Sequence, residues 1–412
     1  MTIAPRSTAY LVLLIALASF GPLSMSIYTP VMPSVAGSLG ASADEVKLTL
    51  TTYMLGFAVG QIFYGPLSDR FGRRPVLLAG LVAFTLTSAG CAFAAGIGQL
   101  IGVRFLQGAG AAAGAVIGRA LTRDAYEYAE MPRIMSWISL AVNISPAIAP
   151  LVGGVLGDLF GWRVTFWLLT VFSAGMLLIV GIGLPETNRH RGASAGMAGM
   201  LRGAGQMLRD RRFLGHMLPM GFAFGIQFGM LAGTPFILQD NLGIPPREFG
   251  LLVVVSVAGF TAGSFFNTRM LGRLSPGRLV RGASLCHIVG LAGIAAFAYA
   301  GILTWWSIML PYTICSFGTG VIVPNANAGA VGLYPRLAGT ASSLVGLAQM
   351  GIGAVGTVVV AALSTVAGLG AALGCASAAC AVPLPLVVAL MPFAVACALS
   401  ARLTRPAVAP GA

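Results

Sequence analysis

Charge is what this sequence has least of. Only 8% of its 412 residues are Asp, Glu, Lys or Arg, whereas a typical soluble domain contains about 25%. In contrast, 57% of the residues are hydrophobic and the mean hydropathy is +0.89. So few polar residues cannot cover the surface of a soluble protein of this length. The composition therefore excludes a soluble globular class and predicts an integral membrane protein, whose exterior is apolar.

Lysine is almost absent, because Lys47 is the one lysine among 24 basic residues and the others are arginines. A net charge of +13 and an isoelectric point near 10.2 would suit a nucleic-acid-binding protein. However, the basic residues lie in short segments between apolar runs, with no lysine-rich tail and no alternation with aromatic residues. We therefore expect no nucleic-acid partner.

Cysteine is scarce, and the sequence offers no nucleotide-binding loop of the form G-x-x-x-x-G-K-[ST]. The cysteines lie inside apolar runs without metal-type spacing, so we expect small core residues and no metal site. The polar segments are too short for an ATPase domain. We therefore expect no cofactor and no catalytic residues, with a gradient across the membrane as the energy source. The six cysteines are Cys91, Cys286, Cys315, Cys375, Cys380 and Cys397.

Apolar runs long enough to cross about 30 Å of hydrocarbon occur twelve times. The first is too long for a secretory signal. A polar insert at 185–212 divides the chain into an N-terminal half, 1–184, and a C-terminal half, 213–412. The runs cover residues 9–35, 46–66, 75–95, 98–121, 134–157, 162–184, 213–239, 248–270, 279–301, 305–332, 338–366 and 369–400.

The arginines between these runs gather on one side of the membrane if the N-terminus is cytoplasmic. The opposite side then receives only Lys47, Arg163 and Arg247, each close to an acidic residue. Because basic loops stay in the cytoplasm, this asymmetry predicts a multi-pass protein with both termini and the 185–212 linker on the cytoplasmic side.

The two halves repeat a short pattern. Asp69-Arg70-Phe71-Gly72-Arg73 follows the second run, and Arg269-Met270-Leu271-Gly272-Arg273 follows the eighth. If the chain consists of two six-helix halves, both stretches follow the second helix of their half. Two matched six-helix bundles with a site between them are a common plan of secondary transporters. The predicted fold class is therefore all-α integral membrane, with twelve transmembrane helices in two pseudo-symmetric bundles.

Residues 65–75, GPLSDRFGRRP, hold four charges between two apolar runs. Gly65 and Gly72 permit close backbone approach, and the prolines mark helix ends. The stretch resembles motif A of the major facilitator superfamily, G-x-x-x-D-R-x-G-R-R/K. An ordinary positive-inside loop would explain the arginines, but it would not explain Asp69 with its flanking glycines.

Two further stretches resemble motifs of the same superfamily. LIGVRFLQGAGAAAG at 100–114 is similar to motif B, with Arg104 inside the fourth run. An arginine at that depth normally faces a polar cavity or a partner, although a snorkelling side chain is the alternative. SPAIAPLVGG at 145–154 resembles the antiporter motif of the fifth helix, and generic packing of small residues is its alternative. Its helix-bending residues would be Pro146, Pro150, Gly153 and Gly154.

The whole pattern most closely resembles the bicyclomycin/chloramphenicol/florfenicol resistance (Bcr/CflA) type of twelve-helix drug/proton antiporters. TLTTYMLGFAVGQIFYGPLSDRFGRRPVLLAG, LTRDAY, GWRVTFW, LPETN and AGTASSLVG occur in the expected order. The resemblance implies multidrug efflux: small amphipathic compounds or antibiotics leave across the bacterial inner membrane by proton antiport with alternating access. It also implies a conformational latch that stabilises the outward-open state, formed by Asp69, Arg73 and Asp124.

One position departs from the family pattern. The family usually has an acid before the first-helix tyrosine, in D-x-Y-x-P, whereas this chain has Ser26-Ile27-Tyr28-Thr29-Pro30. Serine does not titrate in the working range. Either another acid couples protons, such as Asp124 or an acid at an outer helix end, or the protein is a metabolite exporter or an uncoupled facilitator of the same fold. An uncompensated Arg104 would also favour anionic or strongly polar substrates.

Polar and aromatic residues that interrupt the runs are candidates for the substrate cavity. For each of them, hydrogen bonding between helices is the alternative role. The partners expected are a small-molecule substrate and the lipid bilayer, with the protein a monomer. The candidates are Tyr28, Tyr53, Gln61, Arg104, Gln107, Asn143, Gln227, Asn325, Asn327 and Gln349.

A membrane-embedded enzyme is the alternative from a different class. It would need catalytic groups that converge within the bilayer, such as a histidine–acid cluster. Of the three histidines, His190 and His216 lie at or near the central linker and only His287 lies well inside a run. We therefore expect that the protein is not an enzyme.

Overall fold

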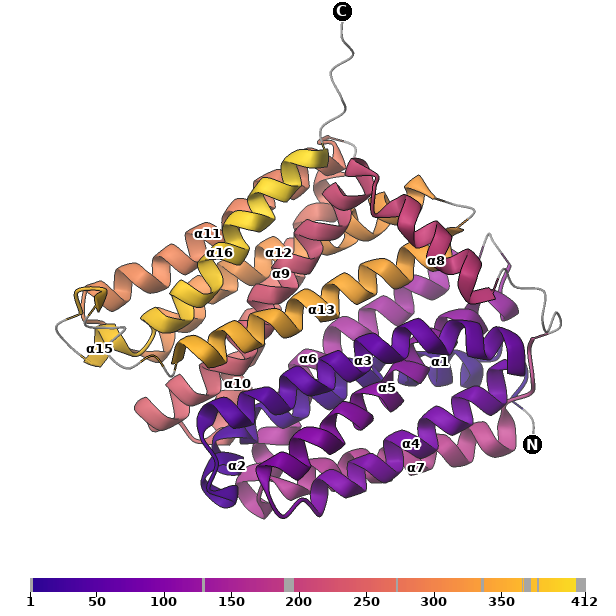
Figure 1. Cartoon of the computed structure of the whole chain (residues 1–412), viewed down its shortest axis with the longest axis horizontal. Coiled ribbons are helices and arrows are strands. Elements are labelled where there is room, and N and C mark those ends of the chain that lie inside the picture. Colours follow the sequence, from indigo (N-terminus) through magenta and orange to yellow (C-terminus); the bar gives the residue numbers. More distant parts are fainter. Residues whose placement is uncertain are drawn as a thin grey trace, which may run out of the picture. The chain divides into compact units, whose positions relative to one another are not determined.

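The structure is a computed structural model of the chain. It describes residues 3–127, 130–188, 196–271, 273–334, 337–364, 366, 372–375 and 378–404. Throughout this part the regular secondary structure is helical, apart from one isolated bridge between Leu271 and Leu274 (Figure 1). The chain divides into two compact units. Unit 1 comprises residues 1–196 and 231–254, and unit 2 comprises residues 197–230 and 255–412.

Eleven helical segments of the described chain are long and apolar enough to cross a membrane, and α6 adds a shorter apolar stretch, Ile144–Phe160. The predicted all-α membrane fold with twelve spans is thereby confirmed. The first six spans are formed by α1 (Thr8–Tyr28) with η1 (Thr29–Val31) and α2 (Met32–Leu39), α3 (Ala43–Phe71), α4 (Arg73–Ala92), α5 (Ile97–Ala125), α6 (Met131–Phe160) and α7 (Arg163–Gly183).

The remaining spans follow a short helix within the central polar insert, which the sequence interpretation did not predict. That helix is α8 (Gly196–Met207). The spans are α9 (Arg211–Phe236) with η2 (Ile237–Asn241), α10 (Pro246–Met270), α11 (Pro276–Tyr299), α12 (Trp305–Leu333), α13 (Ala338–Ser364), and α16 (Leu384–Ser400) with η4 (Ala401–Thr404).

The start of the last span was predicted wrongly. The apolar run begins at residue 369, but α16 begins at Leu384, after the short helix α15 (Ala378–Ala381). Pro383 precedes α16, where a missing N–H costs nothing. A disulfide joins Cys375 to Cys380 in the connection, so the expectation that all six cysteines are simple core residues was also wrong. Hydropathy cannot separate an apolar connection from an apolar helix.

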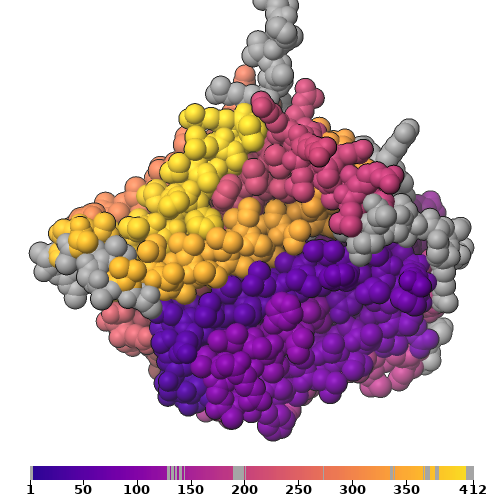
Figure 2. Space-filling model, viewed as in Figure 1, coloured from indigo at the N-terminus to yellow at the C-terminus, as the bar shows by residue number. Residues whose placement is uncertain are grey.

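In unit 1, α3 and α5 lie side by side with their backbones in contact (Figure 1). A Cβ added at Gly108 would lie 2.0 Å from the carbonyl oxygen of Tyr53, and one added at Gly56 would lie 1.9 Å from that of Phe105. Small residues permit such approaches between membrane helices. On the visible face of Figure 2 the atoms of α3 and α5, in indigo and purple, form a continuous surface. This contact places the side chain of Tyr53 on α3 close to that of Arg104 on α5.

The glycines of the fifth-span motif also lie against neighbouring backbones. An added Cβ at Gly153 would lie 2.0 Å from the carbonyl oxygen of Ile27 in α1, and one at Gly154 would lie 2.4 Å from that of Pro246 in α10. Pro146 and Pro150 are inside α6. Their role in bending the helix stays a prediction.

In unit 2, Asp210 lies directly before α9 and accepts hydrogen bonds there. The backbone N–H of Arg212 donates to it at 2.8 Å, and the hydroxyl of Tyr334 donates at 2.8 Å. Burial alone would raise the pKa of Asp210, but the bond from Tyr334 and then the backbone N–H bonds hold that pKa below its ordinary value. The charged carboxylate therefore stabilises the start of α9.

The Gly108 contact predicts a difference between two alanine substitutions on α5. Gly108→Ala should destabilise the folded protein by about 1–3 kcal/mol, because the new methyl group overlaps the backbone of α3. Gly102→Ala is the matched control, since nothing lies within 4 Å of its added Cβ. Thermal unfolding of both purified variants in detergent measures the difference, and equal stabilities would contradict the backbone contact.

The Asp210–Tyr334 bond predicts a pH-dependent stability. Because the pKa of Asp210 is lowered by folding, its contribution is present above the unfolded pKa and is lost as the pH falls through the folded pKa. Tyr334→Phe should therefore lower stability by about 1 kcal/mol at neutral pH, and this deficit should shrink in acid. Tyr299→Phe is the control, because Tyr299 donates to the carbonyl of Leu373, which does not titrate. A Tyr334→Phe deficit that is constant across pH would contradict the assignment.

Candidate functional site

One residue connects the second and third spans. α3 ends at Phe71, α4 begins at Arg73, and Gly72 between them has φ +105° and ψ 155°. L side chains rarely adopt this conformation, so glycine is required there. The sharp reversal places the end of α3 directly beside the start of α4, and with it Asp69 beside Arg73.

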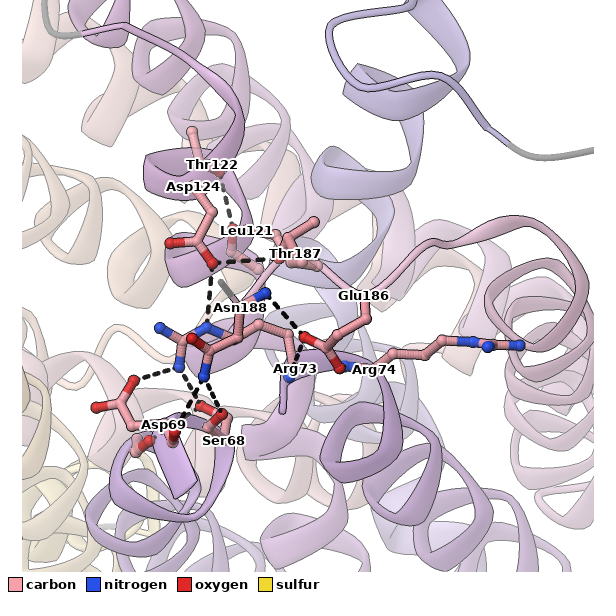
Figure 3. A network of polar contacts seen from close by, with 12 residues as sticks. Ser68, Asp69, Arg73, Arg74, Leu121, Thr122, Asp124, Glu186, Thr187 and Asn188 are labelled. Carbon is pink, nitrogen blue, oxygen red and sulfur yellow. Dashed lines mark hydrogen bonds and ion pairs between the residues drawn. The ribbon is translucent and has the colours of Figure 1, made fainter. Parts of the chain in front are cut away.

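The Arg73 guanidinium is the centre of a charged network at this turn (Figure 3). Its Nη1 forms an ion pair with Asp69 and donates to Ser68 Oγ at 2.8 Å. Its Nε donates to Asp124 Oδ2 at 3.1 Å, from the end of α5. The side chain of Arg73 is 7% exposed, whereas those of Asp124 and Asp69 are 18% and 34% exposed, so water screens the pairs in part. The three residues predicted as a latch thus lie in contact, while their conformational role stays a prediction.

Two residues of the segment after α7 belong to the same network and were missed by the sequence interpretation. Glu186 accepts the backbone N–H groups of Arg73 at 2.9 Å and Arg74 at 3.2 Å, which α4 itself cannot satisfy. Asn188 donates to the backbone carbonyls of Ser68 and Asp69 at 3.3 Å and 2.9 Å. The signal was present in LPETN, whose acid directly follows an apolar run. The network therefore joins α3, α4, α5 and the chain after α7.

Within the spans of unit 1, Arg104 occupies a box of aromatic rings. Its side chain is fully buried, at 0% exposure. The centre of its guanidinium lies 4.4 Å from the ring of Tyr53, 4.7 Å from that of Tyr28 and 5.7 Å from that of Phe166. Aromatic faces attract a cation in such positions. Complete burial among rings is inconsistent with the snorkelling alternative for Arg104.

A chain of hydrogen bonds holds this box in place. Arg104 Nη1 donates to Gln107 Oε1 at 2.7 Å, and Gln107 Nε2 donates to Ser88 Oγ on α4 at 2.8 Å. Tyr28 and Thr49 share a hydrogen bond of 2.9 Å. The Tyr53 hydroxyl donates to the carbonyl of Gly21 at 3.2 Å. The structure thus brings together four predicted cavity residues, Tyr28, Tyr53, Arg104 and Gln107. The sequence interpretation missed Ser88, Thr49 and Phe166, because isolated Ser, Thr and Phe residues in apolar runs carry no distinctive signal.

None of the other predicted cavity residues whose side chains are described has a hydrogen bond to this cluster. Gln61 is buried in unit 1 with its Oε1 unbonded among the described residues, and the side chain of Asn143 lies outside the described residues. In unit 2, Ser316 donates to Gln227 Oε1 at 3.5 Å. Asn325 Nδ2 donates to Asn267 Oδ1 on α10 at 2.5 Å, while Asn327 is exposed and Gln349 is half-buried. Hydrogen bonding between helices is the role that the structure gives to Asn325.

No acid takes the place that Ser26 leaves on α1. Ser26 is 5% exposed. All eleven acidic residues of the chain lie in connections or near helix ends, and none of them forms an ion pair with Arg104 in the described structure. The Arg104 region is therefore a cationic site without an acidic partner.

A second group of charges in unit 1 includes the only lysine. Lys47 is 4% exposed, pairs with Asp44 at 2.9 Å and lies 5.2 Å from the ring centre of Phe236. Nearby in this unit, Gln239 Nε2 donates to the carbonyl of Pro30 at 2.8 Å, and Arg247 lies 3.7 Å from Asp158. The proximity of these cations to acids was expected, but the burial of Lys47 was not.

Comparison with known families decides the class of the protein. The model of the Major Facilitator Superfamily matches residues 14–357. The chain belongs to the Major Facilitator Superfamily. The resemblance stated from its motifs is confirmed, and the molecule is a membrane transporter of the facilitator fold.

Relatives of this facilitator-superfamily chain are aligned over most of their length. An uncharacterized MFS-type transporter, YdgK, of Bacillus subtilis is 31% identical and covers 82% of this chain and 85% of its own. Multidrug resistance protein D of Escherichia coli is 30% identical, and the alignment covers 87% of this chain and 89% of that protein. A bicyclomycin resistance protein homolog of Haemophilus influenzae is 27% identical, and the alignment covers 85% of this chain and 88% of that protein. The bicyclomycin-type assignment is thereby supported.

Solved structures show the same fold at lower identity. An inward-facing, unoccupied bacterial homolog of the human lysosomal transporter Spinster has a TM-score of 0.73 at 18% identity, with 96% of both chains covered. A D-xylose–proton symporter has a TM-score of 0.70 at 14% identity, and the alignment covers 94% of this chain and 97% of the symporter. These likenesses establish the facilitator fold and nothing about the substrate.

The network around Arg73 predicts coupled effects on stability. Arg73→Gln should destabilise the protein by about 1–3 kcal/mol, because it removes the cation that two partly exposed carboxylates share. Adding Asp124→Asn to that variant should cost little more, since the two side chains act as one unit. Arg70→Gln, at an exposed position of the same turn, is the control. A double-mutant cycle of thermal unfolding in detergent measures the coupling, and strictly additive losses would contradict it.

Proposed function

We propose that this facilitator-superfamily chain exports small amphipathic compounds, antibiotics among them, from the bacterial cytoplasm in exchange for protons. The names of two relatives, a multidrug resistance protein and a bicyclomycin resistance homolog, support drug efflux. The observation that carries the proposal is the Arg104 box, a polar and aromatic cluster within the membrane spans. Intramembrane ionisable residues mark transport pathways. The protein is not an enzyme on this proposal, and it needs no cofactor.

Transport would proceed by alternating access, in which the two six-helix bundles move relative to each other. The contacts of Asp69, Arg73 and Asp124 would act as a latch for the outward-open state. Glu186 and Asn188 would strengthen that latch, because they bind the same turn. Opening the latch requires breaking the ion pairs of Arg73 with Asp69 and Asp124, so the network biases the conformational equilibrium.

The proposed location is the bacterial inner membrane, with the protein a monomer and both termini in the cytoplasm. The concentration of arginines in alternate connections supports this orientation. The Arg73 network would then face the cytoplasm, and Lys47 and Arg247 would lie toward the outside. The partners would be the transported molecule and the lipid bilayer.

A second candidate is an uncoupled facilitator or a metabolite exporter. It is favoured by the absence of a carboxylate at Ser26 and by the position of every acid near a helix end. Proton antiport on the first proposal would use one of those terminal acids, such as Asp124. The two candidates differ in whether a pH gradient drives export.

Drug export is tested by antibiotic susceptibility of an efflux-deficient host. Expression of the wild type should raise the inhibitory concentration of at least one amphipathic antibiotic, and Arg104→Ala should abolish the increase. Arg123→Ala, an exposed arginine on the same helix, should leave it unchanged. Unaltered susceptibility to every compound, at normal membrane levels of the protein, would contradict drug export.

Proton coupling is tested in everted membrane vesicles with a fluorescent pH probe. Addition of an exported compound should dissipate the pH gradient, and a protonophore should stop its accumulation against a concentration gradient. Transport that runs only down the substrate gradient, whatever the protonophore does, would establish the facilitator instead. In that case Ser26→Asp should introduce dependence on the pH gradient, because it restores a titratable group to α1.

A further inference from the structure

One edge of the Arg104 guanidinium makes no hydrogen bond within the described part of the chain. Nε and Nη2 are both buried, and neither has a hydrogen-bond partner within the described part of the chain, whereas Nη1 donates to Gln107. Nε–H and Nη2–H lie on the same side of the planar group and point in parallel. This is the fork with which arginine binds two oxygen atoms of one oxyanion.

The aromatic rings restrict the direction from which a ligand can approach. The rings of Tyr53 and Tyr28 lie within 4.4 Å and 4.7 Å of the guanidinium centre. Gln107 accepts the hydrogen bond from Nη1. The donors that remain without a partner lie in the plane of the group, along the Nε–Nη2 edge. A flat acceptor with two coplanar oxygens matches that edge, which is the geometry of a carboxylate.

The charge balance around Arg104 also requires an anion. The polar neighbours of the group are neutral: Gln107 is bonded to Ser88, Tyr28 to Thr49, and Tyr53 to the carbonyl of Gly21. Among the described residues no acid forms an ion pair with this guanidinium, since the acids lie in connections or near helix ends. A buried charge is stabilised when it is paired and fully hydrogen-bonded.

We infer that unit 1 contains a carboxylate-binding subsite, in which Nε and Nη2 of Arg104 are the two donors and the ligand is the carboxylate group of an exported amphipathic acid. The inference rests on the proposed export function and specifies its substrate class. The rings of Tyr28, Tyr53 and Phe166 would contact the apolar body next to the carboxylate. Lipophilic cations are disfavoured, because the fixed positive charge of Arg104 repels them.

Binding to the purified protein in detergent tests the subsite with compounds that differ in one group. The probes are benzoate against benzamide, cinnamate against cinnamamide, and 1-naphthoate against 1-naphthamide, each titrated calorimetrically in low-chloride buffer. At least one carboxylate should bind and its amide should bind about 10- to 100-fold more weakly, because the amide offers one acceptor and no charge. Carboxylates that bind no better than their amides throughout the series would overturn the inference.

Two substitutions separate the subsite from general loss of structure. Arg104→Lys keeps the charge but removes the fork, so it should weaken carboxylate binding about 10- to 100-fold. Gln107→Glu should weaken it as well, because the new acid supplies a competing counter-ion beside Nη1. Arg123→Lys on the same helix should have no effect. Carboxylate affinity that survives both Arg104→Lys and Gln107→Glu in folded protein would overturn the assignment.

Chloride titrated alone is an additional probe. Weak competition of chloride with benzoate would agree with a site for two oxygen atoms. Chloride that binds to the wild type and excludes every carboxylate would overturn the inference.

Transport measurements distinguish failure of this inference from failure of the proposed function. If the wild type exports neutral antibiotics but transports no carboxylate in preference to its amide, the subsite is wrong and drug export stands. If it exports neither class, the proposed function itself is wrong. Preferential export of the carboxylates, lost in Arg104→Lys, would support both.

Discussion

A positive charge buried among membrane helices, with no acid to balance it, is the constraint around which unit 1 is organised. Removal of a guanidinium from water is costly, and three features offset that cost at Arg104: aromatic rings close to its centre, Gln107 on Nη1, and the glycine contact between α3 and α5 that brings Tyr53 close. These features leave one edge without a partner. The structure thereby stabilises the cation and keeps its most selective donors for a ligand.

The charges around Arg73 follow the opposite pattern. There Nε and Nη1 of the guanidinium meet acceptors in Asp124, Ser68 and Asp69, and Glu186 accepts the free N–H groups at the start of α4. Such a network is stable in one arrangement and is lost as a unit when the helices separate. A cation paired with two carboxylates suits a conformational latch, whereas a cation without an acidic partner suits a binding site. The two arginines thus serve different proposed roles because their partners differ.

Much of the fold could be predicted from the sequence, since twelve apolar runs and alternating basic connections are strong signals in lipid. The contact of Asp69, Arg73 and Asp124 could also be predicted, because the resemblance to motif A implied that these three residues lie together. The start of α16 and the Cys375–Cys380 disulfide were not, since an apolar connection has the hydropathy of a helix. Phe166, Thr49 and Glu186 were missed because their roles come from contacts between distant segments. The unpaired edge of Arg104 becomes visible only when its neighbours are known.

An experimental structure of the protein with a bound aromatic carboxylate tests the central claim most directly. The two carboxylate oxygens should lie about 2.8 Å from Nε and Nη2 of Arg104, in the plane of the guanidinium, with Gln107 still bonded to Nη1. The claim is contradicted if that edge is hydrogen-bonded to another protein group while the carboxylate lies elsewhere.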